Sequence, residues 1–164
     1  MQVVGHYLQV EAMKPHNPEE KDLFGRSSYN RYYYATFNIT RDIVRTINPK
    51  WVSSKHAEYP DIFSKKIVGR FKKERSSALK VEDPALVGIL NKAISSANDI
   101  ALLLRKANSA RKVADYDLSI KVNFLNTNRF SLSSIDITSA HLWPERANTL
   151  GSLIIDAWRQ VDVN

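Results

Sequence analysis

The chain has 164 residues, 43% hydrophobic and 25% charged, with no cysteine and a formal net charge of +7. This predicts one folded domain over residues 1–164 and excludes disulfides, thiolate metal sites and cysteine nucleophiles. No basic leader and no run of about 18 apolar residues is present, so we expect a cytoplasmic protein without a membrane anchor.

Hydrophobic residues recur at spacings of three and four along most of the chain, which predicts helices. We expect helices over residues 2–13, 29–47, 62–74, 84–107, 118–125 and 144–161, and loops over residues 14–22 and 126–134. Pro49 stops the second helix, while Asp83 and Pro84 suit the start of the fourth. The predicted fold is all-α, an antiparallel bundle of four to five helices.

Most of the positive charge lies in residues 65–80. Seven basic residues there face one acid, Glu74, which gives the segment a net charge of +6. Such a patch is typical of proteins that bind RNA or another polyanion, although a solvated helix face carries similar charge runs. We predict nucleic-acid contacts at Lys65, Lys66, Arg70, Lys72, Lys73 and Arg75.

The motifs of several enzyme classes are missing from the sequence. Its five glycines are scattered, which excludes a phosphate-binding loop and a dinucleotide fingerprint. Its four histidines lie far apart, so a metal site would need ligands assembled from distant segments. We therefore expect no metal and no cofactor.

Three short motifs, in this order, resemble HEPN domains of prokaryotes. Residues 27–37 (SSYNRYYYATF) are similar to the Arg and paired-Tyr pattern of the family's second helix. Residues 55–58 (KHAE) resemble the turn before the third helix, and residues 110–117 (ARKVADYD) resemble the close of the fourth. The resemblance covers roughly residues 1–125 and leaves residues 126–164 as a less typical helical extension.

The resemblance implies a HEPN-like bundle, often a symmetric homodimer, in proteins tied to RNA cleavage, toxin–antitoxin pairs or antiviral defence. Catalytic members cleave RNA without a metal, using an Arg followed by a His about four to six residues later. Here Arg111 holds the place of the arginine, but Asp115 and Tyr116 stand where the histidine would fall. This departure from the family pattern argues against ribonuclease activity.

The tyrosine motif supplies further candidates. Successive helical residues point about 100° apart, so Tyr32, Tyr33 and Tyr34 cannot all face one core. A ring such as that of Tyr33 either stacks on a base or packs between helices. Arg31 is placed to pair with Asp115 on another helix, which would make both residues structural.

Outside the helices, Lys55 and His56 can either bind phosphate or cap a turn at the surface. Near the end of the chain, we expect Trp143 and Trp158 to anchor the last helix in the core or in a dimer interface.

Three functions fit these observations. The first is a dimeric, RNA-associated HEPN-like module of a prokaryotic defence or toxin–antitoxin system that does not itself cleave RNA. The second is a metal-independent endoribonuclease with an atypical site formed by Arg111, Asp115 and Tyr116. The third is a regulatory subunit that binds a protein encoded nearby. A homodimer is expected because the apolar and aromatic content exceeds what one small bundle needs.

Overall fold

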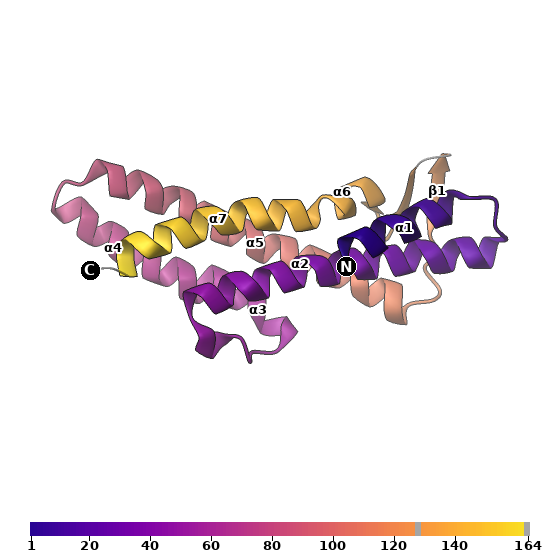
Figure 1. Cartoon of the computed structure of the whole chain (residues 1–164), viewed down its shortest axis with the longest axis horizontal. Helices are drawn as coiled ribbons and strands as arrows, with labels where there is room; N and C mark the ends of the chain where they lie inside the picture. Colours follow the sequence, from indigo (N-terminus) through magenta and orange to yellow (C-terminus); the bar gives the residue numbers. More distant parts are fainter. Residues whose placement is uncertain (127–128, 163–164) are drawn as a thin grey trace. The chain divides into compact units, whose positions relative to one another are not determined.

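The computed structural model describes residues 1–126 and 129–162, and most of them are helical (Figure 1). The main helices are α1 (Gln2–Met13), α2 (Pro18–Ile47), α4 (Val68–Lys80), α5 (Pro84–Tyr116) and α7 (Trp143–Asp162). Shorter helical elements are η1 (Pro49–Trp51), η2 (His56–Glu58), α3 (Tyr59–Asp61), the π-helical η3 (Ile62–Ile67) and α6 (Ile137–His141). The strands are β1 (Asn123–Asn126), β2 (Arg129–Leu132) and β3 (Ile135–Asp136).

Contacts within the chain group it into two compact units. Unit 1 comprises residues 1–38 and 105–145, and unit 2 comprises residues 39–104 and 146–164. The borders fall inside α2 and α5 and near the start of α7. The assignment of residues 1–164 to a single domain stays a prediction.

The main helices begin and end for the reasons visible in the sequence. α2 ends at Ile47, two residues before Pro49, as predicted. At the start of α5, the Asp83 carboxylate accepts a hydrogen bond from the Leu86 amide at 3.0 Å, which confirms Asp83 as the N-cap. The helical pattern continues beyond its predicted end, so α5 extends to Tyr116.

The start of α2 differs from the expectation. Residues 14–22 were expected to form a loop, but α2 begins at Pro18. The side chain of Asn17 accepts a hydrogen bond from the Glu20 amide at 2.9 Å, and Pro18 occupies the first helical position. A capped start with a proline therefore replaces most of the predicted loop.

The stretch after α5 contradicts two predictions. Residues 118–125 were expected to be helical and residues 126–134 to form a loop, yet β1, β2 and β3 form an antiparallel sheet here. Phe130 and Leu132 are both buried two residues apart, which is the spacing of a strand rather than of a helix. Residues 127–128 lie outside the described residues.

Tyr29 of α2 packs against this sheet within unit 1. Tyr29 is fully buried, and its hydroxyl donates a hydrogen bond to the Ile135 carbonyl oxygen at 2.5 Å. Its ring meets that of Phe130 edge to face. Burial raises the pKa of Tyr29 far above its usual value, so this hydroxyl stays a donor at any ordinary pH.

The last helix carries both of the predicted aromatic anchors. Trp143 is 3% exposed in unit 1. Trp158 is half-buried in unit 2, where its ring meets those of Trp51 and Phe71. Trp143 is therefore buried, and Trp158 packs against rings of unit 2, which agrees with a core role.

α5 is long and apolar enough to cross a membrane by length and composition alone, and 39% of its most apolar 18-residue window is buried. Core helices of globular proteins have the same composition. Ala93, Ala97 and Ala101 of α5 are fully buried, as expected of a helix that packs against others. The lack of a membrane anchor and the cytoplasmic location stay predictions.

We predict that Gly151→Ala destabilises unit 2. A Cβ at Gly151 would lie 2.8 Å from Ile43 Cγ1 and closer still to Ile43 Cδ1, so the buried Ile43 side chain would have to shift. The expected loss in free energy of unfolding is about 1–3 kcal/mol in urea titrations. Gly88→Ala is the control, because a Cβ there meets no described atom within 4 Å; it should gain about 0.5–1 kcal/mol. Equal stability of the two variants would contradict the clash.

Candidate nucleic-acid interface

The predicted cations gather on one side of η3 and α4 in unit 2. Arg70, Lys73 and Lys80 follow one another at helical spacings of three and seven, so they share a face. The opposite side carries the apolar residues Phe71 and Ala78, which are buried. Burial of that side turns the charged side toward solvent. We call the following exposed residues the basic face: Lys65, Lys66, Arg70, Lys72, Lys73 and Lys80.

Two members of the basic face already have partners. The Lys65 ammonium lies 2.7 Å from a carboxylate oxygen of Asp61, and Arg70 Nε lies 3.1 Å from one of Glu74. Arg70 also donates to the Val161 carbonyl oxygen at 3.3 Å. Exposed pairs of this kind are weak and open easily, but they reduce the charge available to a ligand.

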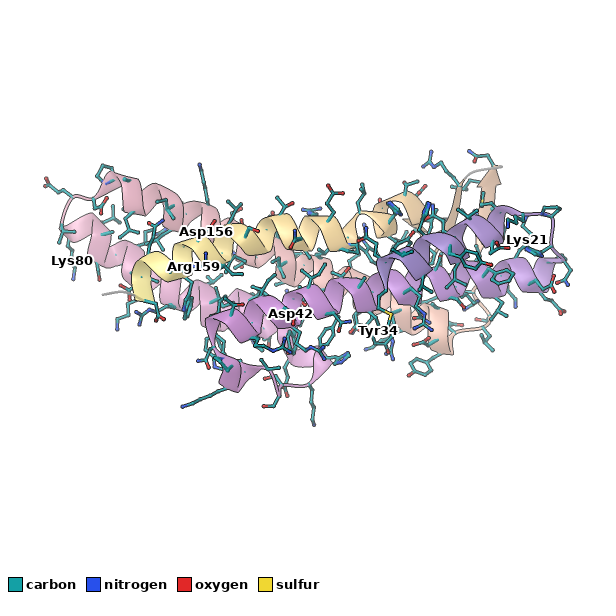
Figure 2. All side chains as sticks on the ribbon, viewed as in Figure 1. Lys21, Tyr34, Asp42, Lys80, Asp156 and Arg159 are labelled. Carbon is teal, nitrogen blue, oxygen red and sulfur yellow. The ribbon has the colours of Figure 1, made fainter. Side chains whose placement is uncertain are left out.

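The other lysines are less constrained. Lys72, Lys73 and Lys80 are exposed and form no ion pair within the part of the chain that the structure describes. Lys80 lies at the end of α4, beside the turn into α5 (Figure 2). The Lys66 ammonium lies over the ring of Trp51, 5.3 Å from its centroid. The uncompensated charge of the basic face is therefore concentrated on lysines.

Arg75 lies at the edge of this arrangement. Its side chain is half-buried and donates a hydrogen bond to Asn91 Oδ1 on α5 at 3.0 Å. The geometry gives Arg75 a place in the contact between α4 and α5. Its predicted contact with nucleic acid stays a prediction.

Lys55 and His56 are exposed at η2 of unit 2. The Lys55 amide donates to Glu58 Oε2 at 3.2 Å, and the Glu58 amide donates to the Lys55 carbonyl oxygen at 2.9 Å. This reciprocal pair caps a turn at the surface, which agrees with the second of the two predicted roles, phosphate binding or turn capping. Among the described residues, no three His, Asp or Glu side chains gather as metal ligands.

The candidate catalytic residues meet in unit 1. Arg111 Nε lies 2.7 Å from Asp115 Oδ2, and Arg111 Nη2 donates to the Tyr34 hydroxyl at 3.2 Å. The guanidinium carbon lies 5.4 Å from the ring centroid of Tyr116 and 5.9 Å from that of Tyr33, close enough for cation–π attraction. We call these five residues the Arg111 cluster.

Asp115 is paired differently from the prediction. Arg31 was expected to reach it, but the Asn30 side-chain amide donates to Asp115 Oδ1 instead. Arg31 is exposed, with Nη1 4.0 Å from Met1 Sδ. One residue along a helix turns the side chain by about 100°, and Asn30 shares the face of Tyr33 and Tyr34, three and four residues later. The predicted pair is therefore wrong.

The three consecutive tyrosines separate as helix geometry requires. Tyr32 and Tyr33 are 0% and 2% exposed, whereas Tyr34 is half-buried. A ring as buried as that of Tyr33 has no free face for a base, so packing is its role. Burial raises the pKa of Tyr33 above its usual value, although the nearby Arg111 charge acts in the opposite direction.

The polar groups at the centre of the Arg111 cluster are held by one another and by Asn30. Burial lowers the pKa of Arg111, but the Tyr34 hydrogen bond and the neighbouring Asp115 charge outweigh burial and raise it. The guanidinium is therefore always charged. Both carboxylate oxygens of Asp115 are occupied, one by Arg111 and one by Asn30.

The sequence reasoning missed Arg26, which is 4% exposed in unit 1. Arg26 Nε lies 2.8 Å from Asp22 Oδ2, one helical turn earlier on α2. The same guanidinium donates to backbone carbonyls at and beyond the end of α5. The only signal in the sequence was the spacing of four between Asp22 and Arg26.

Comparisons of the chain with protein-family models, curated proteins and solved structures found no match. A functional assignment therefore rests on the residues and their geometry.

Proposed function

We propose that the chain is a HEPN-like, RNA-associated helical protein that binds RNA through its basic face and does not cleave it. The observation that carries this proposal is the set of exposed lysines without an ion pair in the described part of the chain, Lys72, Lys73 and Lys80. Unpaired cations on one helix face attract a polyanion. In a nucleic acid, the negative charges that they meet are the backbone phosphates.

The basic face is long enough to contact several phosphates of an RNA backbone. Lys66 and Lys80 are separated by 14 residues, or about 20 Å along a helix. Lys66, Lys72, Lys73 and Lys80 provide the strongest contacts, because Lys65 and Arg70 already have carboxylate partners. Such contacts read charge rather than base sequence.

The HEPN-like part of the proposal is supported by two of the three motifs. Tyr33 and Tyr34 of the first motif contact Arg111 of the third within unit 1. We extend the proposal to the context that the resemblance implies, a prokaryotic defence or toxin–antitoxin system with a protein partner encoded nearby.

The proposal of RNA binding is tested by a salt-dependent gel shift. For a single strand, the logarithm of the affinity falls with the logarithm of the salt concentration by about 0.7 per phosphate contact. Four contacts therefore give a slope of about −3 in a plot of log affinity against log salt concentration. Absence of binding at about 50 mM salt, or a slope near zero, would contradict the proposal.

Arg111→Ala tests the absence of cleavage. We expect that wild type does not degrade structured or single-stranded RNA in the presence of a chelator, because Asp115 is held by two partners. Arg111→Ala, which removes the cation of the cluster, should be equally inactive. The readout is a denaturing gel over hours. A robust wild-type activity that Arg111→Ala loses, with its circular dichroism unchanged, would favour the endoribonuclease alternative.

We also propose a homodimer, and α1 provides the specific observation for it. Val3, Tyr7 and Val10 are exposed by 82%, 61% and 44% and share one helical face. Residues 1–10 contain no Asp, Glu, Lys or Arg. Because each copy carries a net charge of +7, an uncharged apolar face is where two copies meet with least repulsion.

Light scattering at tens of micromolar should therefore give the mass of a dimer. The double substitution Val3→Glu and Val10→Glu should give a monomer, because charge on an apolar face is costly to bury. A monomeric wild type would contradict the proposed dimer, and a dimer unaffected by the substitutions would exclude α1 as its interface.

A further inference from the structure

A tryptophan lies at one end of the basic face. Trp51 is the last residue of η1, and its ring is half-buried in unit 2. The Lys66 ammonium lies over that ring, 5.3 Å from its centroid. Lys66 also belongs to the basic face, together with Lys73 and Lys80. Lys66 therefore places the Trp51 ring next to the cations of the basic face.

The ring of Trp51 is held by packing beneath it. It meets the ring of Trp158 at 6.3 Å between centroids and 78° between planes. Trp158 in turn meets Phe71 at 5.8 Å, and Phe71 is fully buried. Two edge-to-face ring contacts thus link the Trp51 ring to the core of unit 2. A ligand that stacks on a fixed ring loses less entropy than one that must order it.

In the structure, the Lys66 ammonium covers one face of the Trp51 ring. A lysine side chain is long and flexible, and an ammonium at this distance is only weakly attracted to the ring. The ammonium can therefore move to a phosphate and leave its place over the ring to a planar group. Nucleobases stack on aromatic side chains in this way when they are unpaired.

We propose that Trp51 stacks on an unpaired base of an RNA strand whose phosphates lie along the basic face. The site therefore selects single-stranded RNA over duplex RNA. Bases inside a duplex have both faces covered by their neighbours, so a duplex offers the lysines phosphates but offers Trp51 no ring. This inference rests on the proposed RNA binding and names the class of RNA that is bound.

Fluorescence anisotropy with a labelled 12-nucleotide strand and its duplex tests the selectivity at one salt concentration. Trp51→Leu should weaken single-strand binding about tenfold and duplex binding by less than about twofold. Trp51→Phe, which keeps an aromatic ring, should retain most of the affinity. Phe124→Leu is the matched control, because Phe124 is also a half-buried ring beneath a lysine ammonium, that of Lys21, but lies in unit 1; it should change neither affinity.

Tryptophan fluorescence provides a second readout, which does not require Trp51 to be replaced by a non-aromatic residue. Single-stranded RNA should quench the tryptophan emission of wild type, and Trp51→Phe should lose most of that quenching. Heparin, a polyanion without bases, should bind and leave the emission unchanged. Should Trp51→Leu fail to fold, these two measurements decide the question.

The outcomes separate the two proposals. If wild type binds duplex as tightly as single strand, or if Trp51→Leu weakens both equally, Trp51 is only a packing residue and RNA binding by the basic face stands. If wild type binds neither form at low salt, the proposed function fails, and the base-stacking site fails with it.

Discussion

Reversing the charge of Lys72, Lys73 and Lys80 to Glu is expected to weaken RNA binding by about a hundredfold or more near physiological salt. The three side chains are exposed and form no ion pair in the described chain, so the substitutions break no ion pair there. The net charge of residues 65–80 falls from +6 to zero. The helical circular dichroism should stay unchanged.

The salt dependence gives this prediction a second, independent measure. Each phosphate neutralised by a lysine releases condensed counterions, and this release is what weakens binding as salt rises. Loss of three contacts should make the slope less steep by about 2 for a single strand. A weaker affinity with an unchanged slope would mean that the substitutions act through something other than phosphate contacts.

A matched control separates a local surface from net charge. Lys92, Lys106 and Lys112 are exposed on α5, and their substitution by Glu changes the net charge by the same amount. This variant should keep most of the affinity. If both triple variants lose binding equally, the chain attracts RNA by its overall charge. If the first variant keeps full affinity, the basic face is only a solvated helix face.

The structure also refines which lysines to replace. Lys65, Lys66, Lys72 and Lys73 are the densest set in the sequence, but Lys65 pairs with Asp61 at 2.7 Å. A glutamate at that position would face Asp61, so a loss of binding would be mixed with a local distortion. Lys80, at the exposed end of α4, avoids this problem.

The main helices could be predicted from the sequence because their apolar stripes and stop signals are local. Pro49 and Asp83 mark helix ends through their own backbone and side-chain chemistry. The sheet was missed because its strands have only two to four residues each, too short for a clear period. Phe130 and Leu132 were its one signal, and alternation over so few residues is easily overlooked.

For the candidate site, the sequence allowed only the charge of the segment to be predicted, not the contacts of its side chains. The sequence indicated a cationic segment, yet the pairing of Lys65 and Arg70 depends on where carboxylates lie after folding. The choice of Asn30 over Arg31 as the partner of Asp115 depended on the phase of α2 relative to Tyr33 and Tyr34. That phase was present in the sequence, because Asn30 lies three residues before Tyr33.

Arg26 was beyond sequence reasoning for a different reason. Its carbonyl partners lie 87 to 94 residues later in the chain. Backbone carbonyls have no residue identity, so no pattern of amino acids marks them as acceptors. Only the end of α5, where helix carbonyls lack their usual partners, creates the need for such a donor.

Arg26→Ala is expected to lower the free energy of unfolding by about 3–5 kcal/mol, the largest stability effect that we predict. The guanidinium donates to the carbonyl oxygens of Val113 at 3.0 Å, Ala114 at 3.3 Å and Asp117 at 3.1 Å, and also to that of Ile120. Its removal takes a donor from all four carbonyls, of which that of Val113 still accepts from the Asp117 amide at 3.2 Å. Arg26→Lys should recover only part of the loss, because an ammonium lacks the planar fork that reaches several carbonyls at once.

Asp22 makes the loss depend on pH. Burial raises the pKa of Asp22, but the hydrogen bond from the Val122 amide and the bond from Arg26 outweigh burial and lower it. A carboxylate whose pKa is lowered by folding contributes stability above its unfolded pKa of about 3.9 and loses that contribution as the pH falls through the folded pKa. Part of what Arg26 contributes therefore disappears in acid.

Urea titrations at pH 7 and pH 3 measure both effects. The difference in unfolding free energy between wild type and Arg26→Ala should be largest at pH 7 and smaller at pH 3, because protonation of Asp22 removes the partner charge of Arg26. The part due to the carbonyl hydrogen bonds should persist at both values. Arg31→Ala, at an exposed position of the same helix, is the control and should change stability by less than about 0.5 kcal/mol. Equal stability of Arg26→Ala and Arg31→Ala at pH 7 would show that the buried guanidinium does not hold the end of α5 to α2.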